Sequence, residues 1–232
     1  MSSKLGLLFP GNTKTGQPIA LFNLPRIDTC PGASALCIKH CYVKRSNRFP
    51  QVSPSHKARF EATKQADFVD RMVHDIKNSG KKIIRIHTAG DFFSAKYTAD
   101  WVKIAKQNPE VAFYAYTRSW RCSDILRQLD RLRRLPNMQL WWSSDSETGS
   151  PPEGFVAYMA VTDDDVPAFD TTLVFRVQRK ALCKTIGGVN VCPLESGRPE
   201  LKERGLTCAK CRICFSNALV GVSEVTRTTA NM

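Results

Sequence analysis

The sequence predicts an α/β protein whose parallel sheet forms a partial β/α barrel, closed by a cysteine-rich C-terminal cap. Two observations carry this prediction. Short apolar segments typical of strands alternate with segments of helical periodicity, and nine cysteines fall mainly into two groups. Alternating strands and helices are typical of parallel sheets with crossover helices. With 232 residues and 42% hydrophobic content, the chain is long enough to bury a substantial core.

Composition divides the chain into three parts. Residues 1–29 are rich in Gly, Pro, Asn and Thr and predict an irregular lead-in. Residues 30–180 carry the alternating pattern of the partial barrel, and residues 181–232 form the cysteine-rich cap. No helical pattern occurs between residues 143 and 155, which favours a partial barrel over a complete eightfold one.

The expected helices are recognised by apolar residues at helical spacing and by their ends. Phe68, Met72 and Ile76 share one face of the first helical segment. Ser94 is placed to cap the second, because a serine hydroxyl can accept a hydrogen bond from a free backbone N–H. The expected helical segments span residues 55–79 (in one or two pieces), 94–108 and 123–135.

The expected strands are short and rich in β-branched and aromatic residues. They span residues 82–87, 111–117, 138–143, 155–161 and 172–178. Alternation places Arg85 and His87 on one face of the first strand, and Arg118 and Arg176 continue the polar faces of two others. Buried charges are unfavourable unless paired or used, so these side chains predict a polar site inside the barrel. The alternative is that they lie at sheet edges or face solvent.

The chain carries a net charge of +13, which favours binding to nucleic acid through phosphate contacts. The alternative is a basic surface that serves only solubility. One segment is especially basic, with Arg121, Arg127, Arg131, Arg133 and Arg134. Its leucine spacing predicts an amphipathic helix, so these arginines also fit the solvated face of that helix.

The sequence contains no run of eighteen apolar residues and no signal-peptide pattern at its N-terminus. We therefore expect a cytoplasmic protein that does not enter a membrane. In that compartment nine cysteines favour metal binding over disulfides.

The first cysteine group is Cys30, Cys37 and Cys41, with gaps of six and three residues in the stretch CPGASALCIKHCY. Thiolates are soft ligands, and three in one loop can hold three corners of an iron–sulfur cluster or three positions around zinc. The alternative is three buried thiols. Cys122 stands alone, either as a buried thiol or as a fourth ligand of this site.

The second group is Cys208, Cys211 and Cys214, with two-residue gaps, together with Cys192, which precedes a proline. Bacterial ferredoxins use C-x2-C-x2-C and a distant Cys-Pro to bind [4Fe-4S] clusters. A zinc site is the alternative, because zinc also accepts thiolates at this spacing. Cys183 is either an additional ligand or a bystander.

Three cysteines in an early loop, followed by strand–helix units, resemble the radical S-adenosylmethionine (SAM) enzymes. Ala89-Gly90-Asp91 is similar to the turn that follows the second strand in that family and contacts the methionine amino group. The resemblance implies a [4Fe-4S] cluster on the first cysteines, which leaves one iron for SAM and reduces it to a 5′-deoxyadenosyl radical. It also implies that the substrate is faced by Arg85, His87, Arg118 and Arg176.

The segments TCPGAS, HTAGDFFS and YTRSW, with the cysteine-rich tail, resemble the phage gene-product-88-like proteins over most of the chain. This resemblance implies a phage-type protein in the host cytoplasm. The sequence thus leaves two functions open. The first is an enzyme with two iron–sulfur clusters and SAM as a further cofactor. The second is a non-enzymatic protein, stabilised by iron–sulfur clusters or zinc, that binds nucleic acid or a host or phage protein.

Overall fold

A computed structural model describes residues 6–179 and 181–230 of the chain. Its centre is one sheet of six strands that follow one another in space as they do in sequence: β1 (Ile19–Phe22), β2 (Ile83–Ile86), β3 (Ala112–Thr117), β4 (Met138–Ser144), β5 (Phe155–Ala160) and β6 (Leu173–Arg176). Every neighbouring pair is parallel. The prediction of an α/β protein with a parallel sheet is confirmed. The sheet is open, with β1 and β6 at its edges, and does not close into a barrel.

Strand β1 lies inside the segment that the sequence analysis predicted to be irregular, so that prediction was wrong for residues 19–22. The four residues of β1 are all buried, and Ile19 pairs with Ile83 of β2. A strand of four apolar residues, buried on both faces, shows no alternation by which it could be recognised.

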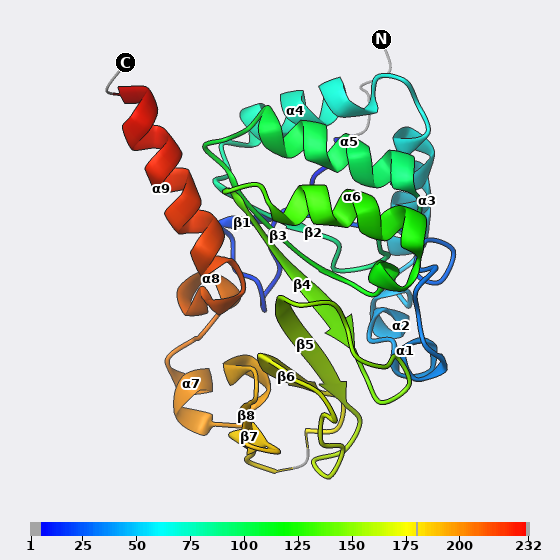
Figure 1. The fold of residues 1–232 in the computed structure, drawn as a ribbon, viewed down its shortest axis with the longest axis vertical. Coiled ribbons are helices and arrows are strands. Elements are labelled where there is room, and N and C mark those ends of the chain that lie inside the picture. Colours follow the sequence, from blue (N-terminus) through cyan, green and yellow to red (C-terminus); the bar gives the residue numbers. More distant parts are fainter. Residues whose placement is uncertain (1–5, 180, 231–232) are drawn as a thin grey trace.

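Helices cover one face of the sheet (Figure 1). They are α3 (Val52–Thr63), α4 (Phe68–Ser79), α5 (Ala95–Lys106) and α6 (Ser123–Arg133). The segment expected over residues 55–79 is therefore two helices, α3 and α4. Ser94 caps α5 as predicted, because its Oγ accepts the Tyr97 N–H at 3.2 Å. Among the described residues, no helix is long and apolar enough to span a membrane.

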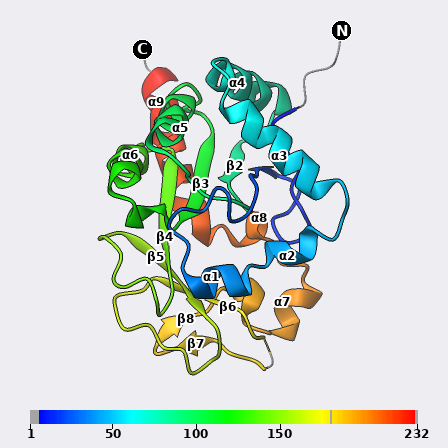
Figure 2. The same ribbon diagram turned by 90° about the vertical axis from the view of Figure 1, so that its right-hand side faces the viewer.

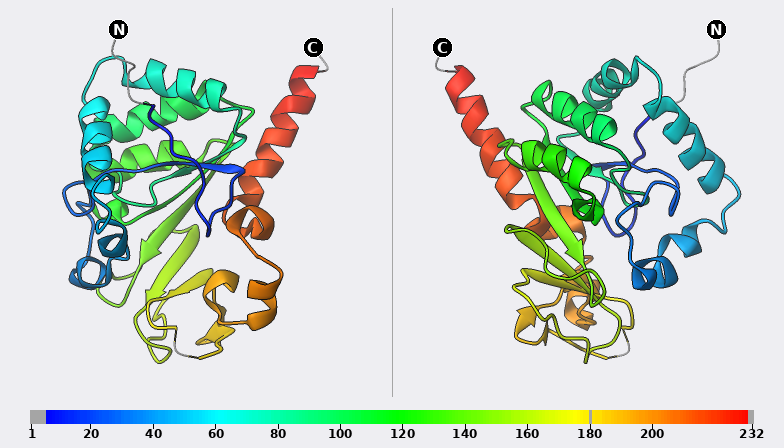
Figure 3. Two further views of the ribbon diagram at one scale, coloured as in Figure 1. Left: turned by 180° about the vertical axis from the view of Figure 1, so that it is seen from behind. Right: turned by 45° about the vertical axis from the view of Figure 1, so that its right-hand side comes forward.

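The C-terminal cap packs on the other face of the sheet, so the sheet lies between α4–α6 and the C-terminal helices (Figures 1 and 3). The cap consists of β7 (Thr185–Ile186), β8 (Val189–Asn190), η2 (Pro193–Glu195), α7 (Pro199–Glu203), α8 (Cys208–Cys211), η3 (Ile213–Phe215) and α9 (Ser216–Ala230). The rings of Phe215 and Tyr114 pack in a tilted arrangement with centroids 5.2 Å apart, and Trp141 Nε1 donates to the Cys214 carbonyl oxygen at 3.0 Å. The cap thus fills the sheet face that the sequence analysis had assigned to an enclosed site.

His87 does not share a face with Arg85, which corrects the prediction from strand alternation. His87 has a left-handed backbone, with φ 64°, just after β2 ends. This reversal turns its ring into the helix-side core, where it packs against Phe92 at 4.8 Å and bonds to the Tyr97 hydroxyl at 2.7 Å. The guanidinium of Arg85 instead lies 5.3 Å from the ring of Tyr116, on the cap side.

Arg176 was also predicted on the face with the polar site, and this placement was wrong. Phe175 takes that face, 5.4 Å from the ring of Tyr116. Arg176 forms two bonds of 2.7 Å to the carboxylate of Asp163 and donates to the carbonyl oxygen of Glu195 at 3.1 Å. Its donors thus join β6 to the cap. The prediction failed because alternation shows which residues of a strand share a face, but not which layer of the protein that face packs against.

Candidate metal centres

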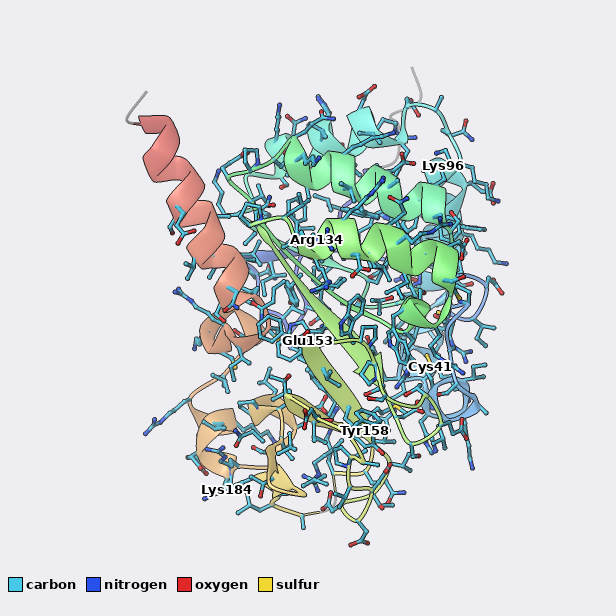
Figure 4. All side chains as sticks on the ribbon, viewed as in Figure 1. Cys41, Lys96, Arg134, Glu153, Tyr158 and Lys184 are labelled. Carbon is cyan, nitrogen blue, oxygen red and sulfur yellow. The ribbon has the colours of Figure 1, made fainter. Side chains whose placement is uncertain are left out.

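The first cysteine group lies in the loop that leaves β1, around the short helices α1 (Ala35–His40) and α2 (Val43–Ser46). Ser34 caps α1, since its Oγ accepts the Cys37 N–H at 3.0 Å. Figure 4 places Cys41 on this segment, beside the ends of the central strands. The loop therefore brings its cysteines to the carboxyl edge of a parallel sheet, where sites in such folds gather.

The thiols of this group influence one another's ionisation. Burial raises the pKa of the Cys30 thiol to about 12, and the nearby charges of Asp91, Cys37 and Cys41 raise it further. Burial also raises the pKa of Cys37, with Cys41 adding to the effect. Thiols that oppose each other's ionisation at close range are the arrangement that a bound metal would stabilise as thiolates.

A turn after β2 supports this loop. Asp91 accepts the Phe92 N–H at 2.7 Å and the Arg118 N–H at 2.8 Å, and its own N–H donates to the Thr29 carbonyl oxygen at 3.0 Å. Burial raises the pKa of its carboxyl to about 6. Gly90 has φ +80°, and a Cβ there would lie 2.6 Å from the Cβ of Leu24. Both carboxylate oxygens of Asp91 are thus engaged by backbone, and the residue positions the loop that carries Cys30.

A buried ion pair supports the same loop from β3 and β4. Arg118 NH2 lies 2.9 Å from Asp145 Oδ2, which also accepts the Ser34 hydroxyl at 2.5 Å. The charge of Arg118 lowers the pKa of Cys37 against the effect of burial. Gly32 packs directly on the chain here, since a Cβ would lie 2.0 Å from the Arg118 carbonyl oxygen. Arg118 is therefore beside the first cysteine group, where the sequence analysis expected a functional side chain.

Cysteines of the second group also influence one another's ionisation. Burial raises the pKa of Cys214 to about 11; the adjacent Tyr116 hydroxyl opposes this shift, whereas Cys208 and Cys211 add to it. Burial raises the pKa of Cys192 to about 12, and Cys214 contributes to that shift. Cys192, just before η2, is thus near enough to Cys214 of η3 for each charge to affect the other, and the predicted four-cysteine site stays a prediction.

Buried polar groups without partners surround the second group. Arg85 Nε and the hydroxyls of Tyr114 and Tyr116 are buried and have no hydrogen-bond partner. Among the described residues, Arg85 has no carboxylate within ion-pair distance. Burial raises the pKa of Cys208, and the positive charges of Arg85 and Lys14 lower it. A buried unpaired cation is strongly unfavourable, so this site is electrostatically suited to an anionic group.

Comparison with known proteins assigns the family. The model of the family described as gene product 88 matches residues 5–217, which include both cysteine groups. The chain belongs to the gene product 88 family.

Two curated relatives agree with this assignment. The chain is 29% identical over 203 residues to the Gene 88 protein of Mycobacterium phage L5, and 27% identical over 202 residues to the Gene 88 protein of Mycobacterium phage D29. Each match covers 81% of this chain and 78% of the relative. No solved structure matches. The predicted resemblance to phage gene-product-88-like proteins is confirmed, while the radical-SAM plan gains no support from these comparisons.

Two cysteines of this gene product 88 family member stand apart from both groups. Cys122 begins α6 and packs against the helix-side core, and its pKa is raised by burial and by Asp124 and Asp91. The Cys183 thiol donates to the Thr185 carbonyl oxygen at 3.2 Å beside β7. Whether Cys122 is a buried thiol or a fourth ligand, and whether Cys183 is an additional ligand or a bystander, therefore stay open predictions.

The sequence analysis missed the groups that hold the two cysteine segments in place. Asp145 could have been found, because it is an acid directly after a predicted strand of a parallel sheet. Glu195 had no such signal. It accepts bonds of 2.6 Å from Lys14 and from Arg179, and so ties the cap to the segment before β1.

Over residues 6–179 and 181–230, no group of three or more His, Cys, Asp or Glu side chains is placed to hold one metal ion. The prediction of metal ligands at Cys30, Cys37, Cys41, Cys192, Cys208, Cys211 and Cys214 therefore stays a prediction. The observation that bears on it is that cysteines of each group shift the pKa values of others in the same group.

Proposed function

We propose that this gene product 88 family protein binds two iron–sulfur clusters. The first is held by Cys30, Cys37 and Cys41, and the second by Cys192, Cys208, Cys211 and Cys214. The observation that carries the proposal is the surroundings of the second group. Cysteines of this group shift one another's pKa values, and beside them lies Arg85, whose Nε is buried without a hydrogen-bond partner and which forms no ion pair with a described carboxylate. A thiolate-bound cluster is anionic, and hydrogen bonds and nearby charge set its stability and potential.

The spacing of the cysteines along the chain favours a cluster over a single zinc ion at the second centre. Cys208, Cys211 and Cys214 form a C-x2-C-x2-C run, and Cys192 precedes Pro193, as in ferredoxin clusters. Zinc sites more often pair two separate C-x2-C segments.

For the first centre we further propose an open iron that accepts SAM. Three thiols are available to a cubane with four iron atoms, and neither His87 nor Cys122 lies with them. Two further features support this step, namely the order of six parallel strands and the Gly90-Asp91 turn after β2. When reduced, such a cluster supplies an electron for cleavage of SAM.

The chain's own residues would act here by position and charge. Asp91 and Arg118 fix the loop, and Arg118 places a positive charge beside Cys37. Because both oxygens of Asp91 accept backbone N–H groups, its contribution to SAM binding would come through the shape of the turn. The cap fills the sheet face beyond Arg85, so a substrate would approach from the carboxyl edge of the sheet.

The decisive experiment is anaerobic purification with iron, acid-labile sulfide and zinc analysis. We expect about eight iron atoms and eight sulfides per chain, the content of two cubanes. Cys211→Ala is expected to remove the second cluster and leave the first, whereas Cys183→Ala, the matched control, leaves both. Stoichiometric zinc without sulfide would overturn the proposal.

A second experiment tests SAM binding. The reduced protein is incubated with SAM and assayed for 5′-deoxyadenosine, with Cys37→Ala as the control. We expect product above that control and a change in the EPR signal of the first cluster when SAM is added. If both are missing in a protein that contains two clusters, the SAM proposal fails and the cluster proposal stands.

A further inference from the structure

A basic surface lies beside the first cysteine group, on α1, α2 and α3, which follow one another along one side of the molecule (Figure 2). Residues 29–60 contain Lys and Arg but no Asp or Glu. The cations of this segment whose side chains are exposed are Lys39, Lys44, Arg45, Arg48 and Lys57. We call these five residues, together with Tyr42 and Phe49, the α1–α3 surface.

The positive charge of this surface is not neutralised by the protein. None of its five cations forms an ion pair with a carboxylate of the described residues, and the one recorded bond joins Lys44 Nζ to the Lys39 carbonyl oxygen at 2.9 Å. The basic helix α6 differs, since Asp124 and Asp130 are interspersed among its arginines and Asp130 pairs with Arg133 at 2.8 Å. The α1–α3 surface is thus the better anion-binding candidate.

Two exposed aromatic residues lie in the same segment as these cations, and the hydroxyl of one, Tyr42, donates to the Thr88 carbonyl oxygen. Tyr42 is 64% exposed and Phe49 is 61% exposed, and they are the aromatic side chains that the described residues expose most. Exposed aromatic rings interleaved with Lys and Arg are the chemistry that binds single-stranded nucleic acid, because bases stack on the rings while phosphates meet the cations. In a duplex the base faces are covered by their neighbours, so such rings would find no partner.

We propose that the α1–α3 surface binds single-stranded nucleic acid, with Lys44, Arg45 and Arg48 contacting phosphates and Phe49 stacking on a base. An anionic membrane is a poorer match. Membrane-surface helices present a long apolar face, whereas α1 has six residues and α2 has four, and the twelve-residue α3 exposes Lys57 and buries Ala62. This inference does not depend on the bound cofactors proposed above.

The test is fluorescence anisotropy with a labelled single-stranded oligonucleotide over a range of salt concentrations. The triple variant Lys44→Gln, Arg45→Gln, Arg48→Gln removes three phosphate contacts, and each contact contributes about 0.7 to the log–log salt slope for single strands. We expect the slope to fall by about 2. The matched control removes three exposed charges, two in α6 and one at its C-cap (Arg127→Gln, Arg131→Gln, Arg134→Gln), and we expect it to keep most of the salt slope.

A single substitution tests stacking. Phe49→Leu keeps an apolar side chain without a ring, and we expect weaker binding by a factor on the order of ten. Iron and sulfide content is measured for each variant, so that loss of a cluster is separated from loss of binding. Equal losses of salt slope in the two triple variants would overturn the proposal. So would duplex binding as tight as single-strand binding and unchanged by Phe49→Leu. Binding to phosphatidylserine vesicles but not to oligonucleotides would assign the surface to membranes instead.

Discussion

Asp145→Asn is expected to destabilise the protein strongly, because it leaves Arg118 buried without its counter-charge. The side chain of Asp145 is 0% exposed and that of Arg118 is 7% exposed, and their charged atoms lie 2.9 Å apart. Removing one partner of a buried ion pair costs about 3–5 kcal/mol. At about 2–4 °C per kcal/mol for a chain of this size, the expected fall in Tm is about 6–20 °C.

The assay is thermal unfolding of anaerobically purified protein, followed by circular dichroism. Asp130→Asn is the matched control, since it breaks an ion pair of similar length, 2.8 Å, whose side chains are 38% and 35% exposed. Exposed pairs contribute about 0.2–1 kcal/mol, so Tm should change little. Asp145 also accepts a hydrogen bond from Ser34 at the start of α1. The iron content of the first centre should therefore fall in Asp145→Asn but not in Asp130→Asn.

A double substitution separates the charge from the packing. Arg118→Met with Asp145→Leu removes both charges and keeps apolar volume, so we expect it to be more stable than Asp145→Asn alone. If Asp145→Asn lowers Tm no more than Asp130→Asn, the assignment of this ion pair as the anchor of the cysteine loop is wrong.

Three further predictions concern the core and the two centres. Burial holds the pKa of His87 at about 3, below its ordinary 6.5, so the stability that neutral His87 contributes is complete above pH 6.5 and falls as pH drops. Between pH 7 and pH 5, the free energy of unfolding measured in urea should fall by about 2 kcal/mol more in wild type than in His87→Phe. Equal falls in the two proteins would refute this prediction. Arg85→Gln removes the cation beside the second group, so the reduction potential of that cluster should fall in an EPR-monitored titration while the first signal is unchanged. Gly32→Ala places a Cβ 2.0 Å from the Arg118 carbonyl oxygen and should lower the iron of the first centre, whereas Gly6→Ala, with no atom within 4 Å, should not.

The sequence determined much of the fold because its local patterns are strong. Helical spacing in α4, α5 and α6 and the apolar strand segments predicted five of the six strands and the parallel sheet that they form. Cysteine spacing alone predicted two metal-binding groups, and within each group thiols shift one another's pKa values. These features depend on neighbours along the chain, so they can be recognised without knowledge of the fold.

Only the tertiary structure decided which side chains meet. Alternation in β2 could not predict that a left-handed backbone at His87 turns its ring into the helix-side core, nor that Phe175 takes the place expected of Arg176. The partners of the cysteine loop, Arg118 and Asp145, follow different strands and meet at one edge of the sheet. Such contacts are set by how strands are ordered and how the C-terminal cap packs on them, and periodicity along the chain carries no information about either.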